Sequence, residues 1–384
     1  MKVCDVAVIL LLAFSCSKVA EQKESDVAVE ALKINQIQVL ASHNSYKEAI
    51  EPPLMSLLLA EDSGFLSLDY QHVSLSQQLD LGLRKLEIDI VHDPEGGRFA
   101  KPLGLTLVKK SGGEPLPYDP DDKMQNPGFK VLHVQDIDFR SNCLCLEDCL
   151  NELKEWSEAH PTHLPIAISF NAKTGKIDRP GFTELLPFSK AAFDSLDASI
   201  LSVISKEKII TPDDIRGTYE TLEAGALNQN WPEIEKVRGK FMFVLDEQAE
   251  KYAPYLEGHP SLKGRVMFVN AAPGTPEAAF IILNDPITYQ DSIQNLVKSG
   301  YIVRTRADAN TMEARTGDYS RFNAALTSGA QFITTDYYLP DERFGTGYQI
   351  KMPDGKIAIC NPITAPENCD DTQLEPSIKD LAKQ

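Results

Sequence analysis

The stretch Leu86-Glu87-Ile88-Asp89-Ile90 alternates apolar side chains with carboxylates and decides how the rest of the chain is interpreted. Alternation over a short segment predicts a β-strand whose successive side chains point to opposite faces. Glu87 and Asp89 then share one face. On an edge strand that face would be solvated, and the apolar face would be the only buried one. In a closed barrel both carboxylates point into the interior, where they need a metal ion or shifted pKa values.

Short apolar segments of the same kind recur along the whole chain, and helical patterns lie between many of them. Strands that alternate with helices predict an α/β fold, here a (β/α)8 barrel of the TIM type. Hydrophobic residues make up 42% of the 384 residues, enough for a large core. The expected strands are residues 37–41, 84–90, 130–135, 165–171, 240–245, 265–270, 301–305 and 331–335.

Four stretches predict helices between these strands. Residues 145–160 carry an apolar stripe at three- and four-residue spacing, and residues 182–204 form a second long candidate. Two shorter candidates, 291–299 and 319–327, are followed by glycines typical of helix ends. We expect one barrel domain over residues 34–345, with long polar insertions at 47–75 and 92–129 as loops, and a tail at 346–384.

The N-terminus predicts a targeting segment over residues 1–16. A basic start is followed by a short apolar run and then small residues, which is the layout of a secretory signal. The run is too short for a membrane-spanning helix. Its end resembles a bacterial lipobox with Cys16 as the lipid-carrying residue, although Phe14 departs from the usual small residue. We expect an exported protein, either a cell-envelope lipoprotein anchored to the membrane or a secreted one, with residues 17–33 as a linker.

The charge of the chain excludes some partners. Lysine and arginine number 38 against 56 acidic residues, which gives a formal net charge of −18. Such a surface repels phosphate backbones, so we expect no nucleic-acid partner. It also argues against docking on anionic membranes through a broad basic patch. We expect a monomer that binds a small substrate.

The seven cysteines fit an exported protein. Cys360 and Cys369 bracket a proline-rich loop, where a disulfide would fix the C-terminal tail. Cys143 and Cys149 are candidates for a second bridge, which leaves Cys145 over. A zinc site is the alternative for this second group, but no other Cys or His pair follows at the required spacing.

Polar residues gather at the expected strand ends, where barrel enzymes build their active sites. Asn44 adds an amide oxygen to the carboxylates of Glu87 and Asp89, and this set suits Ca²⁺, or Mg²⁺, better than zinc. His43 and His133 are candidates for an acid/base pair at a phosphodiester. Lys173 and Arg304 are candidates to stabilise charge on the phosphoryl oxygens. The remaining histidines are interpreted as loop or surface residues: His72, His92, His160, His163 and His259.

This ordered set resembles the phosphatidylinositol-specific phospholipase C-like phosphodiesterases, and most closely the bacterial calcium-dependent phosphoinositide phospholipases C. The resemblance covers roughly residues 35–340. The stretches that carry it are Ser42-His43-Asn44-Ser45-Tyr46, Leu86-Glu87-Ile88-Asp89, the strand with His133, Ile168-Ser169-Phe170-Asn171-Ala172-Lys173, Asn230-Trp231-Pro232, Arg238-Gly239-Lys240, Leu245-Asp246, Val303-Arg304-Thr305-Arg306-Ala307-Asp308 and Thr334-Thr335-Asp336-Tyr337.

The resemblance implies a TIM-type barrel with His43 and His133 as catalytic acid and base. It also implies calcium held by Asn44, Glu87 and Asp89. Calcium-dependent relatives often carry a further Glu in the fourth-strand motif, where this chain has an amide, so calcium affinity is expected to be lower. We expect four residues to contact the substrate: Asn171, Lys173, Arg304 and Asp336.

Two other functions remain open from the sequence. The related glycerophosphodiester phosphodiesterases share a His, a Glu-x-Asp and a second His, so the substrate is a phosphoinositide or a glycerophosphodiester. A barrel that binds a phosphorylated or sugar ligand without turnover, as an envelope lipoprotein, is the alternative outside the enzymes. It is disfavoured because both histidines and both carboxylates are present.

Overall fold

The computed structural model describes residues 31–375. The expected signal segment 1–16, with the lipidation candidate Cys16, lies outside the described residues, as do most of the linker 17–33 and the last nine residues of the tail. Over the described part of the chain, no helix combines the length and apolar character needed to cross a membrane.

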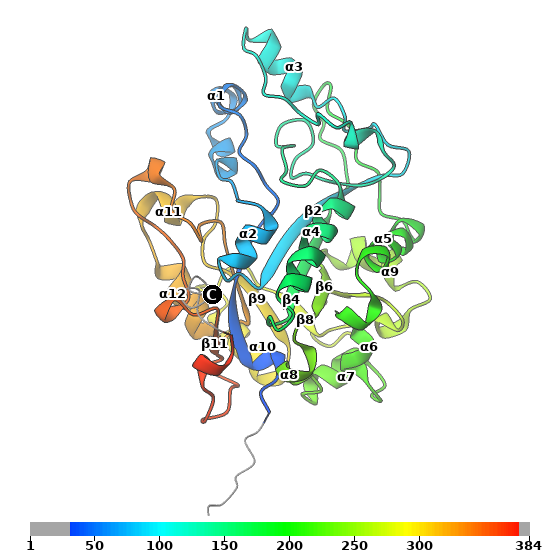
Figure 1. Cartoon of the computed structure of the whole chain (residues 1–384), viewed down its shortest axis with the longest axis vertical. Helices are drawn as coiled ribbons and strands as arrows, with labels where there is room; N and C mark the ends of the chain where they lie inside the picture. Colours follow the sequence, from blue (N-terminus) through cyan, green and yellow to red (C-terminus); the bar gives the residue numbers. More distant parts are fainter. Residues whose placement is uncertain (1–30, 376–384) are drawn as a thin grey trace, which may run out of the picture. The chain divides into compact units, whose positions relative to one another are not determined.

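Eight parallel strands form the closed barrel that the sequence predicts (Figure 1). They follow one another around the ring as β6, β4, β2, β1, β10, β9 and β8, and β7 pairs with the free edge of β6. A parallel bridge between Asn270, just after β7, and Phe280 of β8 closes the ring. The strands are β1 (Ile37–Ser42), β2 (Lys85–Asp93), β4 (Ile166–Ala172), β6 (Phe241–Leu245), β7 (Met267–Val269), β8 (Phe280–Ile282), β9 (Ile302–Arg306) and β10 (Phe332–Thr335), and β5 (Ile209–Ile210) adds a short pairing to β6.

The prediction that residues 130–135 form a barrel strand was wrong. β3 (Gly128–Val131) pairs antiparallel with the end of β2, which at nine residues continues beyond the ring. His133 therefore lies in the turn after β3 and not at the end of a parallel strand. The sequence analysis also missed β8, because a three-residue apolar segment gives almost no periodic signal.

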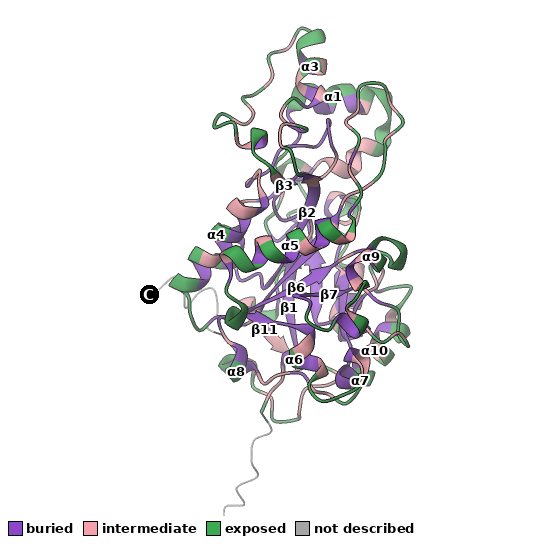
Figure 2. Cartoon of the chain, turned by 90° about the vertical axis from the view of Figure 1, so that its right-hand side faces the viewer, coloured by how far each residue is buried: buried purple, intermediate pink, exposed green. Residues whose placement is uncertain are grey.

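Helices surround the strands and bury their apolar faces against them (Figure 2). The helix predicted at 182–204 begins only at Lys190, where Ser189 accepts a hydrogen bond from the N–H of Ala192 as an N-cap. Gly300 and Gly329 end their helices with positive φ, as the sequence predicts. The helices are α1 (Pro52–Glu61), α2 (Leu75–Asp80), α3 (Leu103–Lys110), α4 (Leu146–Ala159), α5 (Lys190–Val203), α6 (Pro212–Arg216), α7 (Leu222–Leu227), α8 (Ile234–Val237), α9 (Ala249–Leu256), α10 (Gln290–Ser299), α11 (Met312–Thr316) and α12 (Ser320–Ser328).

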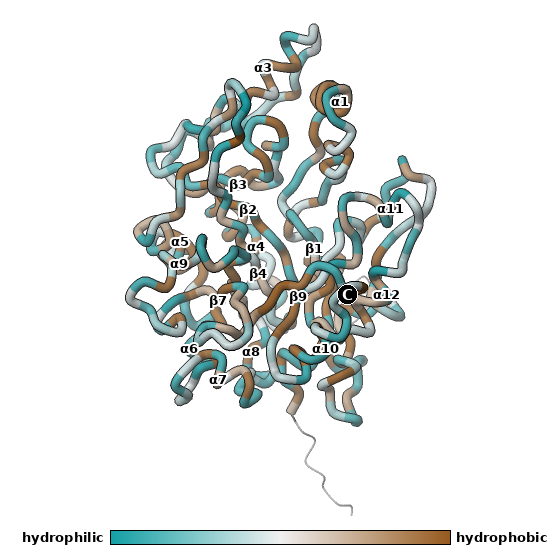
Figure 3. The backbone as a smooth tube through the Cα atoms, turned by 180° about the vertical axis from the view of Figure 1, so that it is seen from behind, coloured by the Kyte–Doolittle hydropathy of each residue, from teal (hydrophilic) through white to brown (hydrophobic). Residues whose placement is uncertain are grey.

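The insertions predicted as loops contain helices of their own. α1 lies in the first insertion and α3 in the second, and both lie beyond the end of β2 (Figure 1). Leu54 and Leu58 of α1 pack with Val108 of α3 in a small cluster separate from the main core. The main core follows the strands, where hydrophobic residues concentrate (Figure 3).

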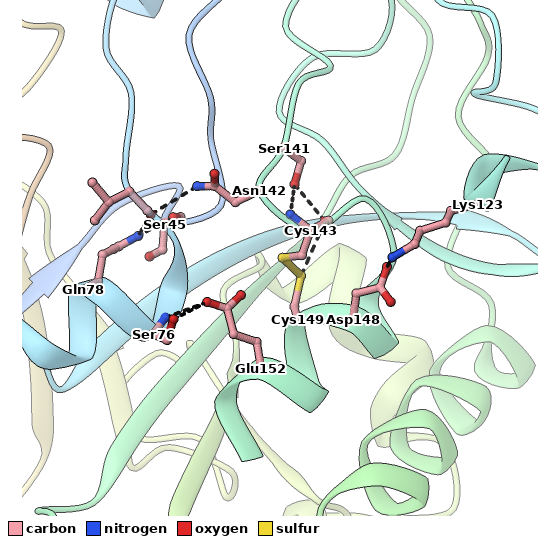
Figure 4. The surroundings of a disulfide bond; sticks show 11 residues. Ser45, Ser76, Gln78, Lys123, Ser141, Asn142, Cys143, Asp148, Cys149 and Glu152 are labelled. Carbon is pink, nitrogen blue, oxygen red and sulfur yellow. Dashed lines mark hydrogen bonds and ion pairs between the residues drawn. A yellow bond between two sulfur atoms is a disulfide. The ribbon is translucent and has the colours of Figure 1, made fainter. Parts of the chain in front are cut away.

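Both predicted disulfides are present. Cys143 and Cys149 are joined at the start of α4, beside the ion pair of Lys123 with Asp148 (Figure 4). This bridge excludes the zinc alternative, because two of the three thiols are consumed and Cys145 is left as a free thiol. Cys360–Cys369 closes the tail loop next to β11 (Ala358–Cys360), which pairs antiparallel with β1.

We expect the replacement of both Cys360 and Cys369 by Ser to lower the free energy of unfolding by about 2–3 kcal/mol. The cross-link restricts the unfolded chain, and a loop of this length accounts for that much stabilisation. Urea denaturation of the oxidised protein measures the change. Cys145→Ser is the matched control, because this thiol forms no bridge. Equal stability of the double variant and the control would contradict the prediction, and free thiols at 360 and 369 on non-reducing mass spectrometry would refute the bridge.

Candidate active site

The polar residues singled out from the sequence gather at the carboxyl ends of the barrel strands. His43 and Asn44 follow β1, Glu87 and Asp89 lie on β2, and Asp336 follows β10. Asn171 and Arg304 come from β4 and β9, Lys173 directly follows β4, and His133 comes from the turn after β3. Because these strands are parallel and closed into a ring, side chains from distant parts of the sequence meet at one mouth.

His43 is held by a buried carboxylate. Its Nδ1 lies 2.9 Å from Oδ1 of Asp336, and its side chain keeps 19% of its surface exposed against 2% for Asp336. On the other side of the ring, Nη1 of Arg306 lies 3.3 Å from Nε2. Burial and the positive charge of Arg306 lower the pKa of His43. The imidazole is therefore fixed in orientation and favoured in its neutral form.

Asp336 organises this half of the site. It accepts a hydrogen bond of 2.9 Å from Nη2 of Arg306 and lies 3.9 Å from Nε2 of His72. Burial alone would raise the pKa of Asp336, but the charges of His43 and Arg306 outweigh it and hold the pKa below its usual range. The sequence predicted a substrate contact for Asp336, whereas its carboxylate is occupied by His43 and Arg306.

The interpretation of His72 as a loop or surface histidine was wrong. His72 is 7% exposed, and its Nε2 lies 2.8 Å from the backbone carbonyl of His43. Burial lowers the pKa of His72 to about 4. Neutral His72 therefore holds the backbone at His43 through the hydrogen bond to its carbonyl. His163 is also buried, against Ser157, because the helix α4 covers it.

His133 forms a second pair with a buried carboxylate. Its Nδ1 lies 2.7 Å from Oδ2 of Asp138, and the His133 side chain is 16% exposed while that of Asp138 is fully buried. A turn in which Asp136 has a φ of 72° brings the two residues together. Lys47 lies 3.2 Å from the other oxygen of Asp138. Burial would raise the pKa of Asp138, but Lys47 and His133 outweigh it and lower the pKa.

Glu87 is buried between two cations inside the barrel. Its Oε2 lies 3.0 Å from Nζ of Lys85 and accepts a hydrogen bond of 2.8 Å from Nη2 of Arg304. Lys85 is 1% exposed and Arg304 is 2% exposed. Burial would raise the pKa of Glu87, but these two cations outweigh it, and the carboxyl group stays ionised. The other oxygen, Oε1, faces Nε2 of His43 at 3.7 Å.

Asp89 has a different environment. Its side chain is almost fully buried, and neither carboxylate oxygen accepts a hydrogen bond from the described residues. Nζ of Lys173 forms an ion pair with Oδ2 at 2.8 Å. Asn171 lies opposite Asp89 in the β2–β4 register, and its amide donates to the backbone carbonyl of Asp246 at 3.3 Å.

The oxygen ligands in this region suit a hard cation such as calcium. Glu87 Oε1 and Asp89 Oδ1 accept no hydrogen bond from the described residues, Asp89 Oδ2 is paired with Lys173, and calcium prefers carboxylate oxygens as ligands. Asn44 directly follows β1 with a left-handed backbone of φ 47°, and its amide nitrogen donates to Tyr70 Oη at 2.7 Å. The amide oxygen of Asn44 is therefore left for a ligand.

Several residues of the site were missed by the sequence analysis. Arg306 contacts His43 directly, and it could have been found because it shares a strand face with Arg304 two residues earlier. Asp138 and Lys47, which hold His133, gave no sequence signal because a turn and an insertion bring them together. Each of the three guanidinium nitrogens of Arg304 donates a hydrogen bond within the protein, to Thr334, Asn284 and Glu87, and the predicted contact of Arg304 with a substrate stays a prediction.

Carboxylate-paired histidines, a guanidinium and buried carboxylates lie at the mouth of a parallel barrel. A family model places this chain in a class of protein, the phospholipase C-like phosphodiesterases, which are phosphoric diester hydrolases. The model of one family within it, described as phosphoinositide phospholipase C, Ca2+-dependent, matches residues 32–362. The chain belongs to this family, whose members are calcium-dependent. No curated protein sequence matches the chain.

The chain is similar to several solved structures of bacterial enzymes. The calcium-dependent phosphatidylinositol-specific phospholipase C of Streptomyces antibioticus is 18% identical, over 80% of this chain and 96% of that chain, with a TM-score of 0.50. The calcium-dependent phosphoinositol-specific phospholipase C of a Pseudomonas species is also 18% identical, over 80% and 91% of the two chains, with a TM-score of 0.48. A glycerophosphoryl diester phosphodiesterase of Parabacteroides distasonis is 14% identical, with coverage of 85% and 92% and a TM-score of 0.30.

Proposed function

We propose that this protein is an exported phosphoinositide phospholipase C-like enzyme that cleaves a phosphodiester by acid/base catalysis with His43 and His133. The observation that carries the proposal is the pair of partly exposed imidazoles, each bound through Nδ1 to a buried carboxylate. A carboxylate on Nδ1 fixes the ring and stabilises its protonated form, which is what a proton-transfer histidine requires.

In the proposed reaction His43 is the general base. Its Nδ1–H donates a hydrogen bond to the carboxylate of Asp336, which leaves the lone pair on Nε2, 3.3 Å from Nη1 of Arg306. Nε2 takes the proton of a substrate hydroxyl, and the hydroxyl oxygen attacks phosphorus. Protonated His133 gives its proton to the leaving alcohol oxygen as that bond to phosphorus breaks. Water then opens the cyclic phosphate with the two roles reversed.

Groups around His43 would stabilise the negative charge on the phosphoryl oxygens. The Arg306 guanidinium lies beside Nε2, where a bound phosphodiester would place its oxygens. Calcium, when bound, would add positive charge to the same phosphoryl group. Asn44, Glu87 and Asp89 would hold it, and their oxygens are the donors that calcium or magnesium takes.

A panel of phosphodiesters tests the function. We expect release of the alcohol from phosphatidylinositol, with a cyclic phosphate detected by ³¹P NMR, and loss of this activity in a chelator with recovery on adding calcium. Faster turnover of glycerophosphodiesters would assign the protein to that chemistry instead. If no diester is cleaved, with or without calcium, the proposal is overturned. The non-catalytic ligand-binding barrel would then be the remaining interpretation.

Export is the part of the proposal that rests on residues 1–16 and on the cysteines. Two disulfides are the pattern of a protein that folds in an oxidising compartment. We propose that Cys16 carries a lipid and anchors the protein to the cell envelope. Metabolic labelling with a fatty acid tests this, and a Cys16→Ser variant that keeps the label would contradict it.

We expect Arg306→Gln to shift the pH profile of kcat/KM. Burial and Arg306 both lower the pKa of His43, so the wild-type enzyme should keep its base neutral to below pH 6.5. Activity falls on the acid side as His43 gains a proton. Removing the neighbouring charge raises this pKa, and the loss of activity should then begin at a higher pH. Arg315→Gln is the control, because Arg315 pairs with Asp69 and not with His43. An unchanged acid limb in Arg306→Gln would contradict the prediction.

A further inference from the structure

The ion pair of Asp89 with Lys173 is the starting point. Asp89 is 1% exposed, and among the described residues no donor satisfies the hydrogen-bond geometry of either carboxylate oxygen. Nζ of Lys173 nevertheless lies 2.8 Å from Oδ2. An ammonium group therefore occupies the side of Asp89 that a metal ion would need.

The strand register explains how Lys173 reaches this position. Asp89 of β2 lies opposite Asn171 of β4, and Lys173 follows two residues later, on the same face. The backbone N–H of Lys173 donates to the carbonyl of Ile90 at 2.9 Å, which extends the pairing beyond the strand. The Lys173 side chain is 26% exposed, so it reaches into the site from the mouth and has room to leave it.

Cationic side chains already lie against the carboxyl groups of this region. Three cations face three carboxyl groups, since Lys85, Arg304 and Lys173 lie against Glu87, Asp89 and Asp246. A divalent ion added to this set would have to overcome the like charge of the nearest ammonium. Asn171, beside Asp89 in the register, contributes an oxygen but no negative charge.

We propose that Lys173 is a built-in cation that competes with calcium for Asp89, and that calcium binds only when this side chain swings out towards the mouth. The inference rests on the proposed metal-dependent function. It assigns to Lys173 a role in setting calcium affinity, separate from a contact with the substrate. Calcium affinity of the wild-type protein is then weak because of one side chain and not because ligands are missing.

Titration calorimetry with Ca²⁺ on the intact chain tests this without any activity measurement. We expect Lys173→Met to bind calcium at least about tenfold more tightly than the wild type, because one positive charge next to the ion is removed. Lys173→Gln should show the same direction, and it keeps a hydrogen-bond donor near Asp89 if the Met variant folds poorly. Lys173→Arg, which retains the charge, should stay close to the wild type.

Lys176→Met is the matched control. Lys176 lies three residues further along, is 67% exposed and pairs with Asp178, so its removal should leave calcium affinity unchanged. Adding Asp89→Asn to Lys173→Met should abolish the gain. If Lys173→Met and Lys173→Gln bind calcium no more tightly than the wild type, the inference is overturned. The metal-dependent function would still stand, because the wild type binds calcium. Absence of calcium binding in every variant would overturn the metal site of the proposed function itself, and this inference with it.

Discussion

Replacing His43 or His133 with Ala should lower kcat by about 10² to 10⁴-fold, the range for losing a positioned proton-transfer group. Each imidazole is bound by a buried carboxylate, and Ala leaves nothing that could move a proton at that point. KM should change much less, because neither ring is placed to supply most of the binding energy. The double variant should be little slower than the slower single variant, since the two groups act together. Steady-state kinetics on a natural diester measures all three effects.

The leaving group separates the two roles. A nitrophenol needs little protonation, so a nitrophenyl diester should restore activity to the variant that lacks the acid and not to the variant that lacks the base. We expect rescue of His133→Ala and none of His43→Ala. His160→Ala is the control, because His160 is an exposed residue directly after the end of α4, and its replacement should leave kcat unchanged. Near-full activity of both single variants would remove the two histidines from the mechanism.

Glu87→Gln should lower the free energy of unfolding by about 3–5 kcal/mol, the usual loss when one member of a buried ion pair is removed. Lys85 and Arg304 are almost fully buried, and Glu87 holds them at 3.0 and 2.8 Å. The variant leaves two buried cations with one neutral amide between them. Denaturant unfolding monitored by circular dichroism measures the loss.

Two further variants identify the cause. Glu158→Gln removes a carboxylate from an exposed pair with Lys154 and should cost at most about 1 kcal/mol. Lys85→Met combined with Glu87→Gln should be more stable than Glu87→Gln alone, because one unpaired cation has gone. If Glu87→Gln were as stable as the wild type, Glu87 would not be the counter-ion of the barrel interior. The same instability makes Glu87→Gln a poor probe of metal binding, which is why Lys173 and Asp89 are the better positions.

Local patterns were enough to predict the barrel and much of its mouth. The alternation of Leu86 to Ile90 requires that Glu87 and Asp89 share a face, because a strand has a period of two, and both point inward as expected. The two disulfides agree with the bridges predicted from the cysteine positions and from the expectation of export. Long strands with flanking helices were found at nearly the right residues. The strand β8 was missed because three consecutive apolar residues show no alternation that separates a strand from other structure.

What surrounds each functional group depended on the fold. Asp336 and Arg306 contact His43 although they are 293 and 263 residues away from it in the sequence. No local sequence pattern relates these residues, because only the closed barrel brings them together. His133 looked like part of a barrel strand, but β3 runs antiparallel on the extended end of β2 and a turn places the ring on Asp138.

Side-chain periodicity is a local property of the backbone, so the amino-acid sequence was enough to predict that Glu87 and Asp89 share a face. Only the tertiary structure decided how the charges are paired: Glu87 with two buried cations, and Asp89 with Lys173. The physical reason is that burial makes an unpaired charge costly, so the partner is whichever opposite charge the closed barrel brings within reach.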